Sequence, residues 1–328
     1  MTVTIGLVSL LVACQPKPSA PGASGETTSG YDSDGGAGDD DSSSGAADTA
    51  DTTDTADTAG HQGPYYIVSN AGSGAMRKYD LDGRYIGDLV APNSFLPGAS
   101  QIEVAPDNRT LLVGTFTDEG VWQVDLETGA DLGPLPGEDF LVAPSVFSYR
   151  ADGALLVSDF IGAVVYAYDF ESGEWLGEAF ETGHQVNPHE VVPVGDDYLV
   201  ADYGAGSITR YDADGAFQGV IANGAELRGP LGMLLTPDGE RLLVSNNANG
   251  TVTSYNPITG EYLGALVSGI GLAYPEGLAI TPDGELLVAS PQNTTIFRVD
   301  IETGEVLGEF EHVDGDEGTV DVLLVQPD

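Results

Sequence analysis

The chain is 328 residues long and carries 52 acidic against 10 basic side chains, which gives a formal net charge of -42 at neutral pH. Nucleic acid is excluded as a partner, because binding it needs a basic surface that displaces the counterions of the phosphates, and so few Lys and Arg residues cannot form one. Cysteine occurs once, which excludes a disulfide framework, whereas 41% hydrophobic residues suffice for a substantial core.

Residues 1–13 are predicted to be a signal peptide, because their apolar run is shorter than the about 20 residues of a membrane-spanning helix. The run ends in Leu11-Val12-Ala13-Cys14, which resembles the lipobox of bacterial lipoproteins. The resemblance implies cleavage before Cys14 and its lipidation; an ordinary cleavage site is the alternative. Gln15 is not the Asp that often retains such proteins in the inner membrane. We therefore expect an outer-membrane lipoprotein of a Gram-negative-type bacterium, either periplasmic or surface-exposed.

Residues 14–63 are predicted to form a disordered linker behind the lipidated cysteine. Asp, Thr, Ser and Gly dominate the segment together with Ala and Pro, and residues 48–59 repeat Asp-Thr-Ala or Asp-Thr-Thr. Such a composition cannot bury a core. Its short acidic runs could bind Ca²⁺ loosely, but a solvated spacer between membrane and domain is the simpler interpretation.

Residues 64–328 repeat two short units about every 44 residues. The first unit is Tyr or Val, then Asp or Asn, then a turn ending in Gly. Its six copies begin at Tyr79, Val124, Tyr168, Tyr211, Tyr255 and Val299. The second unit is an apolar strand, a Pro-Asp-Gly-like turn and another apolar strand, most clearly over residues 280–288. Each unit is typical of a β-hairpin, so one repeat holds four strands, as a β-propeller blade does.

The number of repeats predicts how the ring closes. Five repeats carry both units, whereas the first hairpin has only one strand before it, over residues 65–70. Its missing innermost strand is predicted at residues 319–328, because Val325-Gln326-Pro327-Asp328 aligns with residues 280–283. We therefore expect an all-β, six-bladed β-propeller of four-stranded blades, closed by the C-terminal strand in the first blade. Such closure hides the edges of an open sheet.

The sixth repeat carries a family resemblance. Residues 275–289 read Pro-Glu-Gly-Leu-Ala-Ile-Thr-Pro-Asp-Gly-Glu-Leu-Leu-Val-Ala, which resembles NHL-repeat and gluconolactonase-like six-bladed propellers. The resemblance extends over residues 64–328 and implies the architecture more than the function, since these motifs are turns and strand faces. Gluconolactonase-like propellers hold a divalent metal at the central channel, which implies Ca²⁺ or another divalent ion as the candidate cofactor.

Two rings of aligned residues are predicted to lie at one mouth of the channel. The first ring precedes the inner strands and consists of Asp321, Ser100, Ser145, His189, Leu231 and Glu276. The second follows the second strands and consists of Asn70, Thr115, Asp159, Asp202, Asn246 and Ser290. Together the rings offer the oxygen ligands that Ca²⁺ prefers and one imidazole.

Glu276 and Asp321 are the candidate metal ligands, since they match ring positions of the gluconolactonase-like family. His189 is the candidate general base or third ligand, because imidazole titrates near neutral pH. The ring lacks the Asn ligand of that family, so a water-filled acidic funnel with a hydrogen-bonded His189 is the alternative. NHL-like amidating lyases hold zinc through several His residues, whereas only His189 aligns to the ring here.

Two classes of function remain. The sequence contains no nucleophile elbow and no phosphate loop, which favours a monomeric, lipid-anchored binding or scaffold module. Such a module would present its funnel face to a protein, peptide or glycan. The alternative is a metal-dependent, lactonase-like hydrolase or lyase that uses His189, Glu276 and Asp321, and a purely structural role is the third interpretation. On a six-bladed ring His189 lies opposite Asp321, so joint coordination requires a narrow mouth.

Overall fold

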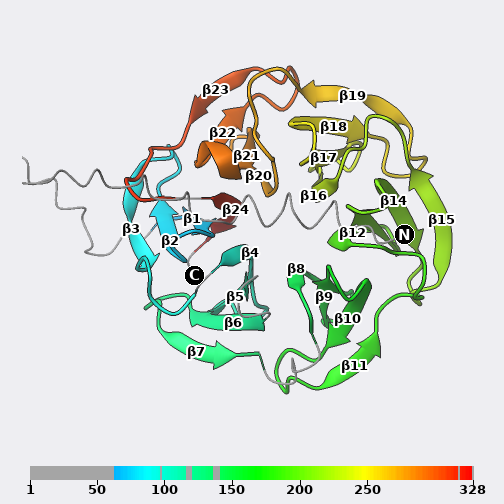
Figure 1. Cartoon of the computed structure of the whole chain (residues 1–328), viewed down its shortest axis with the longest axis horizontal. Coiled ribbons are helices and arrows are strands. Elements are labelled where there is room, and N and C mark those ends of the chain that lie inside the picture. Colours follow the sequence, from blue (N-terminus) through cyan, green and yellow to red (C-terminus); the bar gives the residue numbers. More distant parts are fainter. Residues whose placement is uncertain (1–62, 97, 116–119, 136–140, 317, 327–328) are drawn as a thin grey trace, which may run out of the picture.

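The computed structural model describes residues 63–326 except 97, 116–119, 136–140 and 317. They form six four-stranded antiparallel sheets around a central axis (Figure 1). The predicted six-bladed β-propeller is therefore confirmed. The predicted signal peptide, Cys14 and nearly all of the linker lie outside the described residues and stay predictions.

Within each blade the first strand named here lines the channel and the fourth forms the rim (Figure 1). Blades 1 to 3 consist of β24 (Thr319–Val325), β1 (Tyr65–Asn70), β2 (Met76–Tyr79) and β3 (Tyr85–Val90); β4 (Ala99–Val104), β5 (Thr110–Thr115), β6 (Gly120–Asp125) and β7 (Asp131–Pro134); and β8 (Pro144–Tyr149), β9 (Leu155–Asp159), β10 (Val164–Tyr168) and β11 (Trp175–Glu178).

Blades 4 to 6 consist of β12 (Pro188–Val194), β13 (Asp197–Asp202), β14 (Ser207–Tyr211) and β15 (Phe217–Ala222); β16 (Pro230–Leu235), β17 (Leu242–Asn246), β18 (Thr251–Tyr255) and β19 (Tyr262–Val267); and β20 (Leu278–Ile280), β21 (Leu286–Ser290), β22 (Thr295–Val299) and β23 (Val306–Glu309). A single 3₁₀ turn, η1 (Pro291–Asn293), follows β21. Among the described residues no helix is long and apolar enough to cross a membrane.

The hydrophobic core lies between the blades. Strands β9, β17 and β21 are buried along their whole length, because a neighbouring blade covers each face of the sheet. Each accordingly begins with the apolar run Leu-Leu-Val and lacks the alternation of a half-exposed strand. One cluster packs Ile67 and Met76 of blade 1 against Ile102 and Val113 of blade 2. The same pattern continues around the ring.

The C-terminal strand closes the ring as predicted. β24 pairs antiparallel with β1, with Tyr65 opposite Val325 and Tyr66 opposite Leu324. Both ends of the propeller therefore share one sheet, and no blade is left with an unpaired first strand. Of that sheet, β24 is the innermost strand and lies beside the channel (Figure 1).

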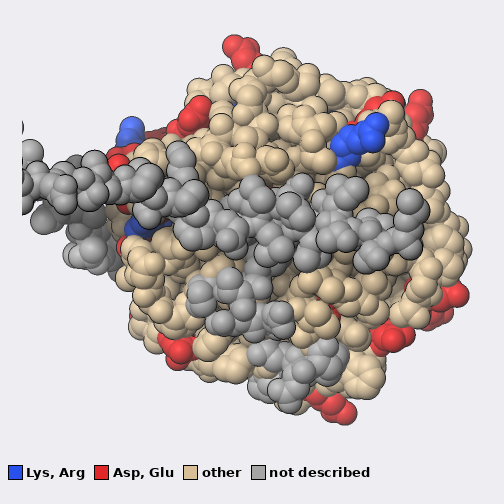
Figure 2. Space-filling view, in the orientation of Figure 1, with Lys and Arg blue, Asp and Glu red and all other residues tan. Residues whose placement is uncertain are grey.

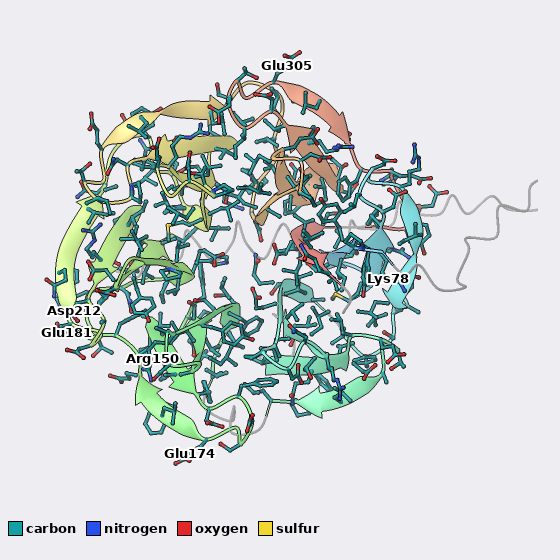
Figure 3. The ribbon with its side chains drawn as sticks, turned by 180° about the vertical axis from the view of Figure 1, so that it is seen from behind. Lys78, Arg150, Glu174, Glu181, Asp212 and Glu305 are labelled. Carbon is teal, nitrogen blue, oxygen red and sulfur yellow. The ribbon has the colours of Figure 1, made fainter. Side chains whose placement is uncertain are left out.

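Charged side chains gather at the rim of the propeller. Figure 2 shows acidic groups around the periphery of the visible face, with few basic groups among them. From behind, the labelled charges Lys78, Arg150, Glu174, Asp212 and Glu305 lie on the outer part of the disc (Figure 3). The six innermost strands contain no Lys or Arg at all. Any acid near the axis therefore lacks a basic neighbour on these strands.

Candidate functional site

One mouth of the channel is built from two kinds of loop that lie side by side. Strands alternate in direction, so the loop after each second strand meets the segment that leads into the first strand. Backbone hydrogen bonds join them: Phe160 N–H donates to the Ala143 carbonyl at 2.9 Å, and Tyr203 N–H donates to the Asn187 carbonyl at 3.0 Å. Asn247 N–H bonds to Gly229 in the same way. The repeat thus places equivalent residues of successive blades around the mouth.

The first predicted ring is buried at this end of the inner strands. Ser100 Oγ donates to the Gly114 carbonyl at 3.1 Å, and Ser145 Oγ donates to the Ser158 carbonyl at 3.2 Å. These two hydroxyls therefore tie the inner strand to its own blade. Leu231 is fully buried and packs against Phe160.

The second predicted ring is buried as well, and its side chains support the loops. Asp159 accepts hydrogen bonds from the backbone N–H groups of Val142, Ala143 and Gly162. Asp202 accepts three equivalent bonds one blade further on. The remaining members make loop or strand hydrogen bonds of the same kind, and they are Asn70, Thr115, Asn246 and Ser290. Much of their hydrogen-bonding capacity is used inside the blade.

His189 offers one buried acceptor that the protein leaves open. Its Nδ1 lies 3.2 Å from the Leu231 carbonyl oxygen. A carbonyl can only accept, so Nδ1 carries the proton and Nε2 is a bare acceptor. Among the described residues Nε2 is buried with no hydrogen-bond partner. Burial lowers the pKa of His189 to about 4, so the ring is neutral at pH 7.

Glu276 and Asn247 form a second polar pair at the mouth. Asn247 Nδ2 donates to Glu276 Oε1 and to the Tyr274 carbonyl, both at 3.3 Å. Asn247 Oδ1 is buried and has no partner within the described part of the chain. Burial, together with the negative charge of Asp321, raises the pKa of Glu276 to about 8. Glu276 is therefore largely protonated at neutral pH.

Asp321 sits where β24 meets blades 2 and 6. Its carboxylate accepts hydrogen bonds from the backbone N–H groups of Ile102, at 3.1 Å, and Val322, at 2.9 Å. Burial raises its pKa to about 7 against these two bonds, which lower it. A side chain at Gly277 would overlap the Asp321 carboxylate. Glu276, one residue before Gly277, is thus a neighbour of Asp321, as the blade order predicts.

Several residues of the mouth were not identified by the sequence alignment. Phe160 and Tyr203 follow the second ring by one residue, and their ring centroids lie 5.7 Å apart. Phe160 also meets the His189 ring edge-on, at 6.2 Å. The available signal was an aromatic or amide residue directly after Asp159, Asp202 and Asn246. The positions directly after these three members of the second ring are Phe160, Tyr203 and Asn247.

Two acids on the inner strands were missed as well. Glu190 follows His189 on β12, and Glu103 lies on β4. Burial and the charge of Asp321 raise the pKa of Glu103 to about 7 and raise that of Glu190 well above its ordinary value. These interactions place Glu103, Glu190 and Asp321 close enough to repel one another. No ion pair among the described residues involves any of these acids or Glu276.

The residues present do not fit the divalent metal that the family resemblance implies. In the described part of the chain no three His, Cys, Asp or Glu side chains converge as a metal ion requires. The Asp321 carboxylate is held by two backbone amides, and His189 is turned to Leu231 through Nδ1. Glu276 and Asp321 are neighbours, whereas His189 does not join them in a common coordination site.

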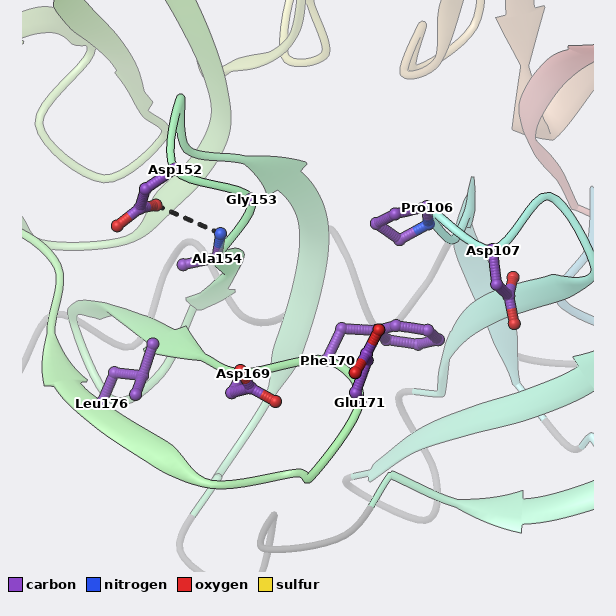
Figure 4. A pocket seen from close by; sticks show the side chains of 9 residues that line it. All are labelled: Pro106, Asp107, Asp152, Gly153, Ala154, Asp169, Phe170, Glu171 and Leu176. Carbon is purple, nitrogen blue, oxygen red and sulfur yellow. Dashed lines mark hydrogen bonds between the residues drawn. The ribbon is translucent and has the colours of Figure 1, made fainter.

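A cavity of about 390 Å³ lies at the opposite end of blades 2 and 3 (Figure 4). It is lined by the turns between first and second strands, with Asp107 and Asp152, and by the outer hairpin with Asp169 and Glu171. Hydrogen bonds to neighbouring turn residues lower the pKa values of Asp107 and Asp169. Asp152 pairs with Arg150 at 2.7 Å. These acids therefore stabilise turns, and the cavity has no counterpart of the open acceptors at the mouth.

Comparisons with known proteins support the fold. No protein-family model matches the chain, and no curated protein matches it either. A chain from the crystal structure of a nidogen/laminin complex has a TM-score of 0.68 and 14% identity, covering 81% of this chain and 99% of its own. A protein of unknown function from Bacteroides caccae has a TM-score of 0.60 and 14% identity, covering 80% and 99%. At this identity the likeness is to the propeller fold alone, which hosts many functions.

Proposed function

We propose that this protein is a binding module of the bacterial cell envelope that takes its ligand at the mouth formed by Phe160, His189, Tyr203, Asn247 and Glu276. The observation that carries the proposal is the pair of buried, unpartnered acceptors at this mouth, His189 Nε2 and Asn247 Oδ1. An unsatisfied buried polar atom costs about 1–3 kcal/mol. A ligand that donates to either atom recovers that cost.

The aromatic side chains support the same conclusion. Phe160 is buried, Tyr203 is partly exposed, and the two pack together beside His189. An apolar wall with a few convergent polar atoms is the usual composition of a ligand site. The nidogen/laminin neighbour was solved as a complex between proteins. A protein or peptide that inserts one side chain into the mouth therefore agrees with the proposal.

The proposed setting of the module comes from the sequence. Cleavage before Cys14 and its acylation would attach the chain to the outer membrane, with the linker of residues 14–63 as a spacer. Stable anchoring needs more than one acyl chain, as lipoproteins of this type carry. Mass spectrometry of the mature N-terminus tests this part: an acylated Cys14 is expected, and an intact Met1 contradicts it.

The binding proposal is tested by a ligand-observed NMR screen of fragments that carry N–H or O–H donors. We expect hits for the full chain that are lost in His189→Phe, because Phe removes the Nε2 acceptor while it keeps a flat ring of similar size. His184→Phe is the matched control, since His184 stacks on Phe217 at the rim, with ring centroids 3.8 Å apart. Hits that survive in His189→Phe, or no hits with the wild type, contradict the proposal.

A further inference from the structure

We propose that the ligand group bound at the mouth is a primary ammonium, held by His189, Asn247 and the acidic side chains along the inner strands of the channel. The inference rests on the proposed function and specifies its chemistry. It has three supports: acids near the axis without basic neighbours, buried acceptors without a partner, and aromatic side chains beside His189.

Four acidic side chains lie at successive depths along the channel. Glu276 and Asp321 lie at the start of the inner strands, Glu190 is one residue further along β12, and Glu103 lies deeper, on β4. The inner strands carry no Lys or Arg, and no described ion pair reaches these four residues. A cation that enters the mouth therefore meets several carboxyls without a basic partner, and its positive charge favours their ionised form.

Two buried acceptor atoms without a partner require a hydrogen-bond donor on the ligand. His189 is only 1% exposed and Asn247 only 2%, yet Nε2 of the one and Oδ1 of the other have no partner among the described residues. Nδ1 of His189 is turned to Leu231, so Nε2, the ring nitrogen farther from the main chain, is left for the ligand. Both atoms accept and neither donates, so a ligand group that reaches either of them must carry an N–H or O–H bond.

The aromatic wall favours a compact cation. Phe160 and Tyr203 pack beside His189, and an ammonium over an aromatic face gains further attraction. A primary ammonium offers three N–H donors on one point charge. It can therefore donate to an acceptor and to a carboxyl at the same time. A quaternary ammonium has the charge without the donors, and a metal ion needs three convergent ligands, which the described residues do not provide.

Isothermal titration calorimetry with n-butylammonium, butyltrimethylammonium and butyrate tests the inference on the full chain. At pH 8.5 we expect n-butylammonium to bind at least about tenfold more tightly than its trimethyl counterpart, since the latter cannot donate to His189 or Asn247. Butyrate should not bind. Equal binding of the two cations, or binding of butyrate alone, overturns the inference.

Two variants locate the binding. Glu276→Gln and Glu190→Gln should each weaken n-butylammonium about tenfold, because each removes a carboxyl that can ionise beside the cation. Glu174→Gln makes the same chemical change at the rim (Figure 3) and should leave binding unchanged. Wild-type affinity in both mouth variants overturns the inference. Using two variants keeps the test decisive if one of them fails to fold.

Additional ligands distinguish a peptide from a free polyamine as the source of the ammonium, and they separate failure of the ammonium inference from failure of the proposed function. N-acetyl-lysine methylamide presents the ammonium as a peptide side chain, and butane-1,4-diamine presents it as a free polyamine; the tighter probe identifies the source. Donor fragments without charge that bind in a His189-dependent manner, while n-butylammonium does not bind, contradict the ammonium inference and leave the proposed function standing. Absence of every ligand contradicts both.

Discussion

At the scale of single residues, Glu276 makes the stability of the folded protein depend on pH. Its pKa is raised from 4.5 to about 8 by burial and by Asp321. A carboxyl with a raised folded-state pKa binds its proton more tightly when folded. Its contribution to stability is therefore greatest below pH 4.5 and falls as the pH rises toward 8. Asp321, Asn247 and Tyr203 are the groups that face it.

Glu276→Gln should remove this pH dependence. Gln keeps the shape and can still accept the bond from Asn247, but it never ionises. We expect a melting temperature close to that of the wild type at pH 5 and at least about 10 °C above it at pH 9, taking ~1.4 kcal/mol per pKa unit and ~2–4 °C per kcal/mol for a domain of this size. Differential scanning calorimetry measures both. The rim variant Glu174→Gln should show no such difference, and an equal effect of Glu276→Gln at both pH values contradicts the explanation.

The mouth was only partly predictable from single residues. Aligning the repeats identified His189, Glu276 and Asp321, because each precedes an inner strand. The alignment could not show that Asp159 and Asp202 turn their carboxylates to loop amides, since that depends on loop conformation. It also missed Phe160 and Tyr203 by one residue.

At the scale of elements, the glycines of the outer hairpins connect neighbouring blades. Gly260, in the turn between β18 and β19, has φ of 71°, and a side chain there would overlap the Ile221 carbonyl of blade 4. Gly129 and Gly304 meet the outer strand of the preceding blade in the same way. The glycine that the sequence repeat predicts as a turn residue therefore also sets the spacing between blades.

Gly260→Ala should cost more stability than an alanine at a turn glycine of similar conformation. Gly239 has φ of 72° and nothing near its missing side chain, so Gly239→Ala reports backbone strain alone, about 1 kcal/mol. Gly260→Ala adds the overlap with Ile221, about 2 kcal/mol more. Urea denaturation measures the free energies of unfolding. Equal losses in the two variants would show that the blade contact adds nothing.

The sequence predicted the strands better than these contacts. Alternating turns and apolar runs indicate each hairpin locally, and the structure confirms four strands in every blade. The contact of Gly260 with Ile221 joins residues about 40 positions apart. No local pattern marks which atom of the preceding blade the glycine will meet.

At the scale of the whole molecule, the closed ring was predictable from the number of repeats and the number of strands in each. Six hairpins and a first repeat that lacks one strand require the C-terminal strand in blade 1, and β24 pairs there with β1. The charge has a similar global explanation. Among the described residues no ion pair involves a residue of the inner strands, which hold acids but no Lys or Arg. The axis is thus the part of the propeller where carboxyl groups lie without basic neighbours on the inner strands.

The central claim is that this axis, at the mouth beside His189, is where the molecule binds its ligand. Crystals of the protein soaked with fragments that carry N–H or O–H donors test it most directly, because the position of each bound fragment is seen. The account predicts fragments at the mouth, with a donor within hydrogen-bond distance of His189 Nε2 or Asn247 Oδ1. Fragments bound only at the rim or in the cavity beside Asp107 and Asp152, with the mouth holding none, would contradict it.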